Sequence, residues 1–566
     1  MMEPKNKIDE KMKIYLNDEI TSSSYQYKKF QDKLTLRKKK IFNILFSKKK
    51  DIFKNDNLNN INDSRKIDIN SLNCDKEIKK DVDNYIKTKF NIKNWFKFLF
   101  SSNINDNMLS LFLIEKYINL QVLEIKDPNK RKLSRNDTEL IQKLCNNLLS
   151  DNIKIIYNSC SCLTNLTFFP KNIENRIYHE KNLEKILQFF DVLSKNITML
   201  GYEPLKLFSN ICHNEDVKIY LIKHSFLDKF YNFFHVLFDN KNINLNKEIE
   251  IKKIKNCVDI FSLLITICNI DDNYINRFLN FIPIFKSITN KYYANIDDSM
   301  FDEEGTLSLI IIWKFYSKNR ENNKSYVNEI IKDSFFKILV QVYYKIKDIK
   351  KKIKMIELFV DFVSIDDDVD KILINDGIID FYAKEIEKYE FSNIEILNNI
   401  IFSCSNLSVG VIGQIEKLFE SGIIFKAIDI GSFYINDNLD DEIKNILINI
   451  VGLICNCLNS DYDKIRKNIL NYKKFIIINI FCKILKIDLD KFNKHQLIQK
   501  IVYSINDLNV ISEELEPNLE EEYHLLLINN SLDELLNNYY EKNYLEQNIK
   551  DIIDNIKTFI KDFHNK

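Results

Sequence analysis

Asparagine recurs at near-regular intervals along this 566-residue chain, each time after a small residue and within an apolar, helix-like stretch. Because an amide side chain both donates and accepts hydrogen bonds, such a row can bind a ligand in a groove or bind the neighbouring helical unit. The residues alone leave both roles open. The five clearest positions, which we term the markers, are Asn165, Asn210, Asn269, Asn406 and Asn456.

Residues that support catalysis or metal binding form no recognisable motif. The seven histidines show no His-x-x-x-His spacing, and the two Cys-x-Cys pairs, which begin at Cys160 and Cys455, have no second pair or nearby histidine. The Gly-x-x-Gly that begins at Gly410 is not followed by the Lys-Ser of a phosphate-binding loop. We therefore expect a protein that is not an enzyme and that uses no cofactor or metal.

The composition favours an all-α fold. The chain has only 8 glycines and 6 prolines, whereas sheet-rich folds use these residues in turns and bulges.

The N-terminal sequence MMEPKNKIDEKMK lacks the apolar core of a secretory signal. The longest apolar runs, such as Phe475 to Cys482, are too short to span a membrane. We expect a soluble, intracellular protein that does not bind membranes.

The markers are part of an internal repeat. Two weaker members, Ser317 and Asp361, fill the gap between Asn269 and Asn406, and successive markers are then 44 to 59 residues apart. A second marker follows about 15 to 17 residues later, as a small residue before apolar ones. Its members are Ser225, Ser334, Gly377 and Gly422. A period near 45 with two to three helices per unit is typical of armadillo and HEAT arrays. We therefore predict a right-handed α-solenoid of about ten armadillo repeats with a basic N-terminal arm.

Charge divides the chain into an arm and a body. The segment from Lys28 to Lys54 carries a net charge of about +9, which leaves about −8 on the remainder. We assign residues 1–54 to the arm, 55–85 to a flexible polar linker and 86–566 to the solenoid. The arm could equally be a solvated tail or a nonspecific nucleic-acid binder. Because an acidic body would be repelled by phosphates, we expect no nucleic-acid partner.

At this point the sequence resembles a known family. The whole chain is similar to importin alpha (karyopherin alpha), the armadillo-repeat adaptor for nuclear import. The resemblance rests on four segments: the basic Lys33 to Lys40 (KLTLRKKK) followed by LFSKKK, Ser102 to Tyr117, Ser403 to Phe425, and Tyr523 to Ile556. They match the family's importin-beta-binding segment, its first repeat, a central repeat and the terminal repeat, respectively.

The resemblance implies a function. The protein would bind basic nuclear localization signals of cargo in its concave groove, link them to importin-beta, and be recycled by a nuclear export receptor, in cytoplasm and nucleus. The importin-beta-binding and self-inhibitory residues would be Arg37, Lys38, Lys39, Lys40, Lys48, Lys49 and Lys50. The cargo-binding residues would be Asn165, Asn210, Asn269, Trp313, Phe402, Asn406, Asn456 and Asp216.

One departure from the family pattern concerns the tryptophan that precedes each marker by four residues. Only Trp313 keeps the indole and only Phe402 keeps a ring, while Lys206 would repel a cationic ligand. We therefore expect that nuclear localization signals are bound more weakly or in an altered way. We also expect binding to shift toward the C-terminal part of the groove, which is the minor site of the family. Ordinary core packing is the alternative role for both rings. The alternative function is an armadillo-repeat scaffold with another partner, such as a cytoskeletal or assembly factor.

Overall fold

A computed structural model describes most of the chain from Phe98 onward, and the predicted arm and linker lie outside the described residues. The described ranges are 98–125, 137–169, 171–195, 202–239, 247–269, 275–318, 324–363, 365, 367–389, 392–409, 412–435, 440–459, 463–486, 491–540 and 546–564. The chain divides into two compact units, Met1–Lys229 and Phe230–Lys566. Regular structure within these ranges is helical throughout, and no helix among them is long and apolar enough to cross a membrane.

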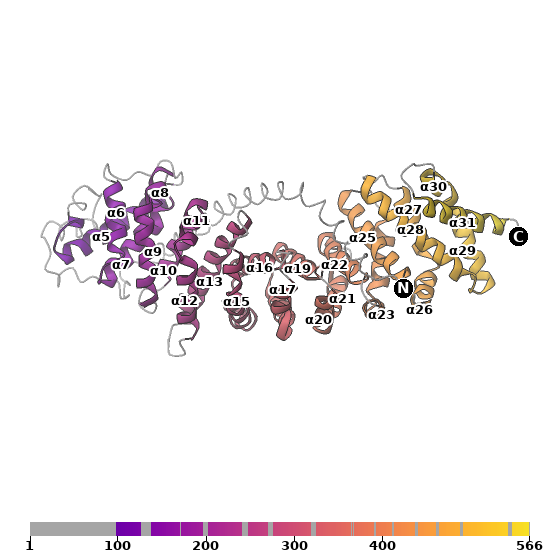
Figure 1. The fold of residues 1–566 in the computed structure, drawn as a ribbon, viewed down its shortest axis with the longest axis horizontal. Coiled ribbons are helices and arrows are strands. Elements are labelled where there is room, and N and C mark those ends of the chain that lie inside the picture. Colours follow the sequence, from indigo (N-terminus) through magenta and orange to yellow (C-terminus); the bar gives the residue numbers. More distant parts are fainter. Residues whose placement is uncertain are drawn as a thin grey trace. The chain divides into compact units, whose positions relative to one another are not determined.

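From α8 onward, the helices in unit 1 follow the order short, second, third (Figure 1). The third helices α5, α7 and α10 pack side by side, and the second helices α6 and α9 form a parallel row. The helices are α5 (Ile104–Glu124), α6 (Asp137–Asn147), α7 (Ile153–Leu166), α8 (Lys171–Ile177), α9 (Glu180–Lys195), α10 (Glu203–Ile211) and α11 (Glu215–Lys223), and the boundary with unit 2 falls within α12 (Phe226–Asp239).

Unit 2 continues the same order. Its third helices pack each against the next and form what we call the third-helix row: α13 (Lys247–Leu264), α16 (Glu303–Lys318), α19 (Ile349–Val363), α22 (Ile394–Leu407), α25 (Asp441–Leu458), α28 (Lys491–Ser512) and α31 (Gln547–His564). The second helices are α15 (Ile282–Ile288) with the π-helical turn η4 (Thr289–Ala294), α18 (Phe335–Lys345), α21 (Ile378–Tyr389), α24 (Ile423–Tyr434), α27 (Ile476–Lys486) and α30 (Leu532–Tyr540).

The helices at the short-helix position of each repeat of unit 2 are α14 (Ile275–Leu279), α17 (Lys324–Ile331), α20 (Asp367–Asn375), α23 (Ile412–Glu420), α26 (Asp463–Asn471) and α29 (Pro517–Asn529), of which α29 is the longest. Single turns are η2 (Ile265–Asn269), η5 (Asp298–Met300) and η6 (Lys332–Ser334). Apolar side chains of each repeat pack between its three helices and those of the next repeat. In unit 1, for example, the rings of Phe190, Phe208 and Phe226 are mutually in contact and fully buried.

The second marker of the sequence has a backbone explanation. Ser225, Ser334, Gly377 and Gly422 all lie between a short helix and a second helix, and all four have a positive φ, between 57° and 93°. The sharp turn between these helices requires the left-handed conformation, which costs an L-residue with a side chain about 1–2 kcal/mol. Glycine avoids this cost, and serine is the alternative at these positions.

Gly422→Ala is expected to lower the free energy of unfolding by about 1 kcal/mol, because φ is 76° there. No atom lies within 4 Å of the added methyl group, so the loss would come from the backbone alone. Gly413→Ala, on α23, is the matched control: it also has open space, but its φ is not positive. It should leave stability unchanged or raise it slightly. Urea denaturation of both variants measures the difference, and equal effects would contradict the explanation.

Candidate functional site

Three of the predicted asparagines bind the preceding third helix. Asn165 is 5% exposed, and its Nδ2 donates to Oδ1 of Asn119 on α5. Asn210 Nδ2 donates to Thr167 Oγ1 at 2.9 Å. Asn456 Nδ2 donates to the Ser405 carbonyl at 3.0 Å, which joins α25 to α22. The sequence left two roles open for these amides, and their donor groups have the second one: they bind the neighbouring repeat.

The other marker residues lie in different settings. Asn406 is half-buried on α22. Asn269 ends the turn η2, and its side chain lies outside the described residues, as do all the predicted basic residues of the arm. Asp216 is exposed at the start of α11, where its neighbour Glu215 pairs with Lys218 at 2.7 Å.

Trp313 is a core residue in this structure. Its ring is fully buried, its Nε1 donates to Thr289 Oγ1 at 3.3 Å, and its centroid lies 4.9 Å from that of Phe335. A ring without exposed surface cannot stack on a ligand side chain. The prediction that Trp313 lines a peptide site is therefore corrected in favour of its alternative, core packing.

The correction follows from an error in register on α16. The proposed marker Ser317 is 3% exposed, and its hydroxyl donates to the Lys314 carbonyl of its own helix. The half-buried Lys314 instead reaches the next third helix, where it pairs with Glu357. The half-buried Phe315 takes the place of the marker on α16, because the order of buried and half-buried residues around it is the same as that around Asn406 on α22. The position four residues before Phe315 is Ile311, two residues away from Trp313.

A second set of amides, missed by the sequence analysis, accompanies the markers on α22 and α25. Asn449 Nδ2 donates to Asn398 Oδ1 at 2.8 Å. Gly452 lies four residues before the marker Asn456, and a Cβ there would lie 3.2 Å from Ser405 Oγ. The close approach of the two helices therefore leaves no room for a ring. The signal in the sequence was an asparagine seven or eight residues before each of the markers Asn406 and Asn456.

Together these residues form one polar surface of unit 2, which we call the amide face. It consists of Asn398, Asn399, Phe402, Asn406, Asn445, Asn449 and Asn456. Asn445 is exposed and Phe402 is half-buried on α22, and the role of Phe402 in cargo binding stays a prediction. Carboxylates flank this face at the N-terminal ends of the two helices, where Glu395, Asp441 and Glu442 are exposed.

Comparisons with known proteins fix the fold. No family model and no curated protein matches the sequence. An engineered protein of known structure is similar over 84% of this chain and 99% of its own, with 11% identity and a TM-score of 0.54. A structure described by the interaction between cadherin and β-catenin covers 85% of this chain and 94% of its own, with 9% identity and a TM-score of 0.52. A designed armadillo repeat protein in complex with the peptide (KR)4 covers 49% of this chain, with 12% identity and a TM-score of 0.36.

This chain has an armadillo-repeat fold. The fold class predicted from the sequence, an all-α solenoid of armadillo repeats, is confirmed. Armadillo repeats consist of a short, a second and a third helix, as described above for both units.

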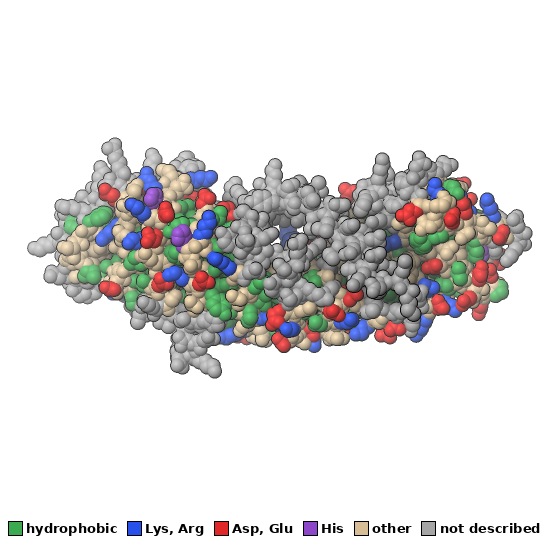
Figure 2. Space-filling model, in the orientation of Figure 1, with side chains coloured by type: hydrophobic (Ala, Val, Ile, Leu, Met, Phe, Trp, Pro, Cys, Tyr) green, Lys and Arg blue, Asp and Glu red, His purple; other side chains and the backbone are tan. Residues whose placement is uncertain are grey.

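Carboxylates on the armadillo repeats from α13 to α19 are paired with lysines of the same chain. Lys255 pairs with Asp302 at 2.8 Å, and Lys351 pairs with Glu303 at 3.3 Å. Figure 2 shows acidic and basic side chains interspersed on the visible described surface of each unit, without a large block of one sign. The negative charge of these carboxylates is therefore balanced within the chain.

Two lysines on third helices, Lys206 on α10 and Lys500 on α28, also have partners within the protein. The ammonium of Lys206 lies 4.5 Å from the centroid of the Tyr202 ring. Lys500 Nζ on α28 donates to Asn456 Oδ1 at 3.1 Å, and burial lowers the pKa of Lys500. Asn456 thus uses both ends of its amide within the protein, as donor to α22 and as acceptor from α28.

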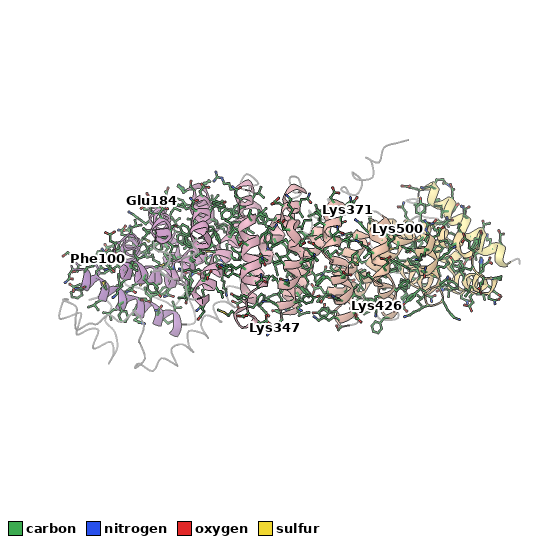
Figure 3. The ribbon with its side chains drawn as sticks, turned by 90° about the horizontal axis from the view of Figure 1, so that it is seen from below. Phe100, Glu184, Lys347, Lys371, Lys426 and Lys500 are labelled. Carbon is green, nitrogen blue, oxygen red and sulfur yellow. The ribbon has the colours of Figure 1, made fainter. Side chains whose placement is uncertain are left out.

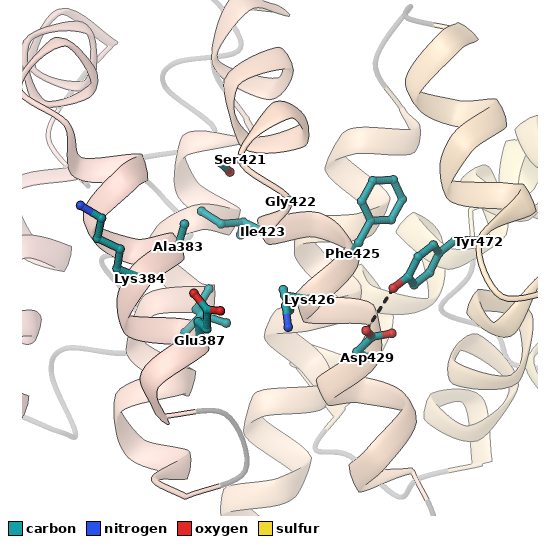
Figure 4. A pocket seen from close by; sticks show the side chains of 11 residues that line it. Ala383, Lys384, Glu387, Ser421, Gly422, Ile423, Phe425, Lys426, Asp429 and Tyr472 are labelled. Carbon is teal, nitrogen blue, oxygen red and sulfur yellow. Dashed lines mark hydrogen bonds between the residues drawn. The ribbon is translucent and has the colours of Figure 1, made fainter.

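Two grooves open along the second-helix edge of unit 2. The first has a volume of about 440 Å³ and lies between α21 and α24 (Figure 4). Figure 4 shows Glu387 opposite Lys426, and the hydrogen bond of 3.0 Å from the Tyr472 hydroxyl to Asp429. The second, of about 510 Å³, includes Lys347, which lies with Lys426 along one edge of unit 2 (Figure 3). Both grooves mix charges and show no cluster of catalytic groups.

The thiols of the described repeats are poor nucleophiles. The nine cysteines whose side chains the structure describes are all buried, and burial raises the pKa of the Cys145 and Cys455 thiols to about 12. No group of three or more His, Cys, Asp or Glu side chains in those ranges could hold a metal ion. What the described arrangement offers chemically is therefore hydrogen bonding and charge pairing along the third-helix row.

Proposed function

We propose that the protein is a binding scaffold that holds an extended basic peptide on the amide face of unit 2. The observation that carries this proposal is that α22 and α25 bear a row of amides, joined across the two helices by the bond from Asn449 to Asn398. The same helices carry the half-buried Phe402 and, at their N-terminal ends, the exposed Glu395, Asp441 and Glu442. An amide group suits the backbone of an extended chain because it offers a donor and an acceptor. Asn456 does not take this role, since both ends of its amide bind within the protein. Asn445, whose side chain is exposed, is the first candidate. The ring and the carboxylates suit the stem and the charge of lysine or arginine.

The kind of ligand also has support from a structural neighbour. The neighbour described by the interaction between cadherin and β-catenin binds another protein. A polypeptide ligand in this chain is in keeping with that example. Enzymatic activity is not part of the proposal.

The more specific form of the proposal is a nuclear import adaptor. In this form the ligand is a basic nuclear localization signal, the arm at residues 1–54 binds importin-beta, and a nuclear export receptor returns the adaptor from nucleus to cytoplasm. Support comes from the resemblance of the arm and from its charge of about +9, which complements the carboxylates that flank the amide face. The alternative is an armadillo-repeat scaffold with another partner, for which the arm has no special role.

Peptide binding is tested by fluorescence anisotropy with a labelled peptide of eight alternating lysines and arginines. Phe402→Ala is expected to weaken binding about three- to fivefold, which corresponds to one exposed cation–π contact. Phe433→Ala is the matched control, because Phe433 is half-exposed on the second helix α24. If both substitutions have the same effect, or if the wild-type chain does not bind the peptide, the proposal is wrong.

The adaptor form is tested separately with importin-beta. The full-length chain should bind importin-beta, and replacing Arg37, Lys38, Lys39 and Lys40 with alanine should remove most of that binding. Replacing four lysines outside the arm, such as Lys171, Lys181, Lys223 and Lys371, is the control, because each is exposed. Absence of binding by the wild-type chain would favour the scaffold with another partner.

A further inference from the structure

One repeat of unit 2 carries carboxylates where its neighbours carry amides or rings. On α19 the marker is Asp361, and Glu357 stands four residues earlier, at the position that Phe402 occupies on α22. Residues four apart lie on the same face of a helix, so the two carboxylates lie side by side on α19. Each is about one-quarter exposed: 23% for Glu357 and 25% for Asp361.

A lysine from the preceding repeat occupies these carboxylates. Lys314 on α16 donates from Nζ to Glu357, and the same atom lies 4.0 Å from Asp361 Oδ2. The side chain is 20% exposed. Burial lowers the pKa of Lys314, although both carboxylates act in the opposite direction. Burial also tends to raise the pKa of Glu357, but Lys314 and Lys354 reverse this and lower it.

We propose that Glu357 and Asp361 form a binding site for a lysine side chain of the peptide ligand, and that Lys314 fills this site in the free protein. That the lysine belongs to a peptide ligand rests on the proposed function. That the two carboxylates enclose an ammonium group is observed in the structure and does not depend on the proposed function. An ammonium group enclosed by two carboxylates on one helix face is what a bound lysine of a basic peptide would present.

The location of the site supports a role in the same binding event. α19 packs directly against α22, so the two carboxylates lie on the helix next to the amide face. A peptide that extends from the amide face by one repeat would reach them. It must first displace Lys314, and occupation by Lys314 therefore lowers the apparent affinity for the peptide.

Lys354 provides a matched control. It pairs with the same Glu357 and lies on α19 itself, three residues earlier, with 40% of its side chain exposed. Replacing Lys314 or Lys354 changes the net charge by the same amount. Only Lys314 comes from the preceding repeat and lies within 4.0 Å of Asp361. A difference between the two substitutions thus reports on the site and not on net charge.

The first experiment tests the site without any peptide. Lys314→Ala should lower the melting temperature, and n-butylammonium should restore it in a saturable manner. We expect a recovery of about 2 °C or more beyond that of sodium at equal ionic strength. Lys354→Ala should show no such recovery, because Lys314 still fills its site. Failure of n-butylammonium to restore Lys314→Ala, or equal recovery of both variants, would overturn the inference.

The second experiment measures competition with the alternating lysine–arginine peptide. Lys314→Met keeps the apolar stem and should bind the peptide about fivefold or more tightly than the wild type, whereas Lys354→Met should change affinity less than about twofold. Equal affinities of the two variants would refute the competition. If n-butylammonium restores Lys314→Ala but no form binds the peptide, the lysine site stands and the proposed function fails. If the wild type binds the peptide but neither experiment separates the two lysines, the proposed function stands and this inference fails.

Discussion

Trp313→Ala is expected to lower the free energy of unfolding of unit 2 by about 3–5 kcal/mol, which is typical for removal of a fully buried large aromatic side chain. The ring has no exposed surface, and its Nε1 hydrogen bond to Thr289 would be lost as well. Trp313→Phe keeps part of the contact with Phe335 and should cost less. Guanidinium denaturation followed by circular dichroism measures both.

The control for this prediction is Phe433→Ala, which removes a ring that is 50% exposed and should cost about 1 kcal/mol or less. A residue that contacts a ligand would behave in the opposite way. Its loss would weaken peptide binding and leave stability nearly unchanged. If Trp313→Ala weakened peptide binding and left stability nearly unchanged, the indole would be a ligand contact, and its role in core packing would be contradicted.

Lys253→Met is expected to stabilise unit 2 at neutral pH, and the gain should disappear in alkaline solution. Lys253 lies on α13 with no exposed surface, and burial lowers its pKa from 10.5 to about 8. Between pH 8 and pH 10.5 the unfolded chain holds the proton that the folded chain has released. The unfolded state binds more protons in this window, so wild-type stability rises with pH there.

Below pH 8 both states hold the proton, and the full cost of the buried ammonium is present. A pKa lowered by this amount corresponds to about 3 kcal/mol at pH 7. Thermal unfolding at pH 7, 9 and 10.5 should therefore show a gap between Lys253→Met and wild type that narrows as pH rises. Lys252→Met, at the half-exposed neighbouring position paired with Glu248, is the control and should show no narrowing. A gap that stays constant with pH would contradict the assignment.

Local sequence determined the repeat and its phase. The left-handed turn between short and second helix accepts glycine readily and serine at a cost, so Gly377, Gly422 and Ser334 appear in step with the helices they join. Scarcity of glycine and proline elsewhere favours helices, and the apolar spacing defines their buried faces. These are properties of single residues and their near neighbours, so the all-α armadillo fold could be predicted from the chain alone.

The partners of the marker amides depended on the tertiary structure. The sequence indicated that Asn165, Asn210 and Asn456 recur on one helix face, but an amide bonds equally well to a peptide backbone or to an adjacent helix. Packing of α22 against α25 brings Asn456 to the Ser405 carbonyl, which lies 51 residues away in the chain. A local sequence pattern cannot show which residue 51 positions away will be the partner.

The register of α16 was also decided by tertiary packing. A shift of two residues along a helix rotates a side chain by about 200°, which is enough to move it from a ligand-facing surface into the core. The sequence offered Trp313 and Ser317 at the spacing of a marker pair, while packing turned both inward and turned Lys314 toward Glu357. The sequence by itself thus determined the fold class and the period of the repeats. Only the stacking of one repeat on the next decided which side chains remain on the surface, because that choice depends on contacts between residues about 45 positions apart.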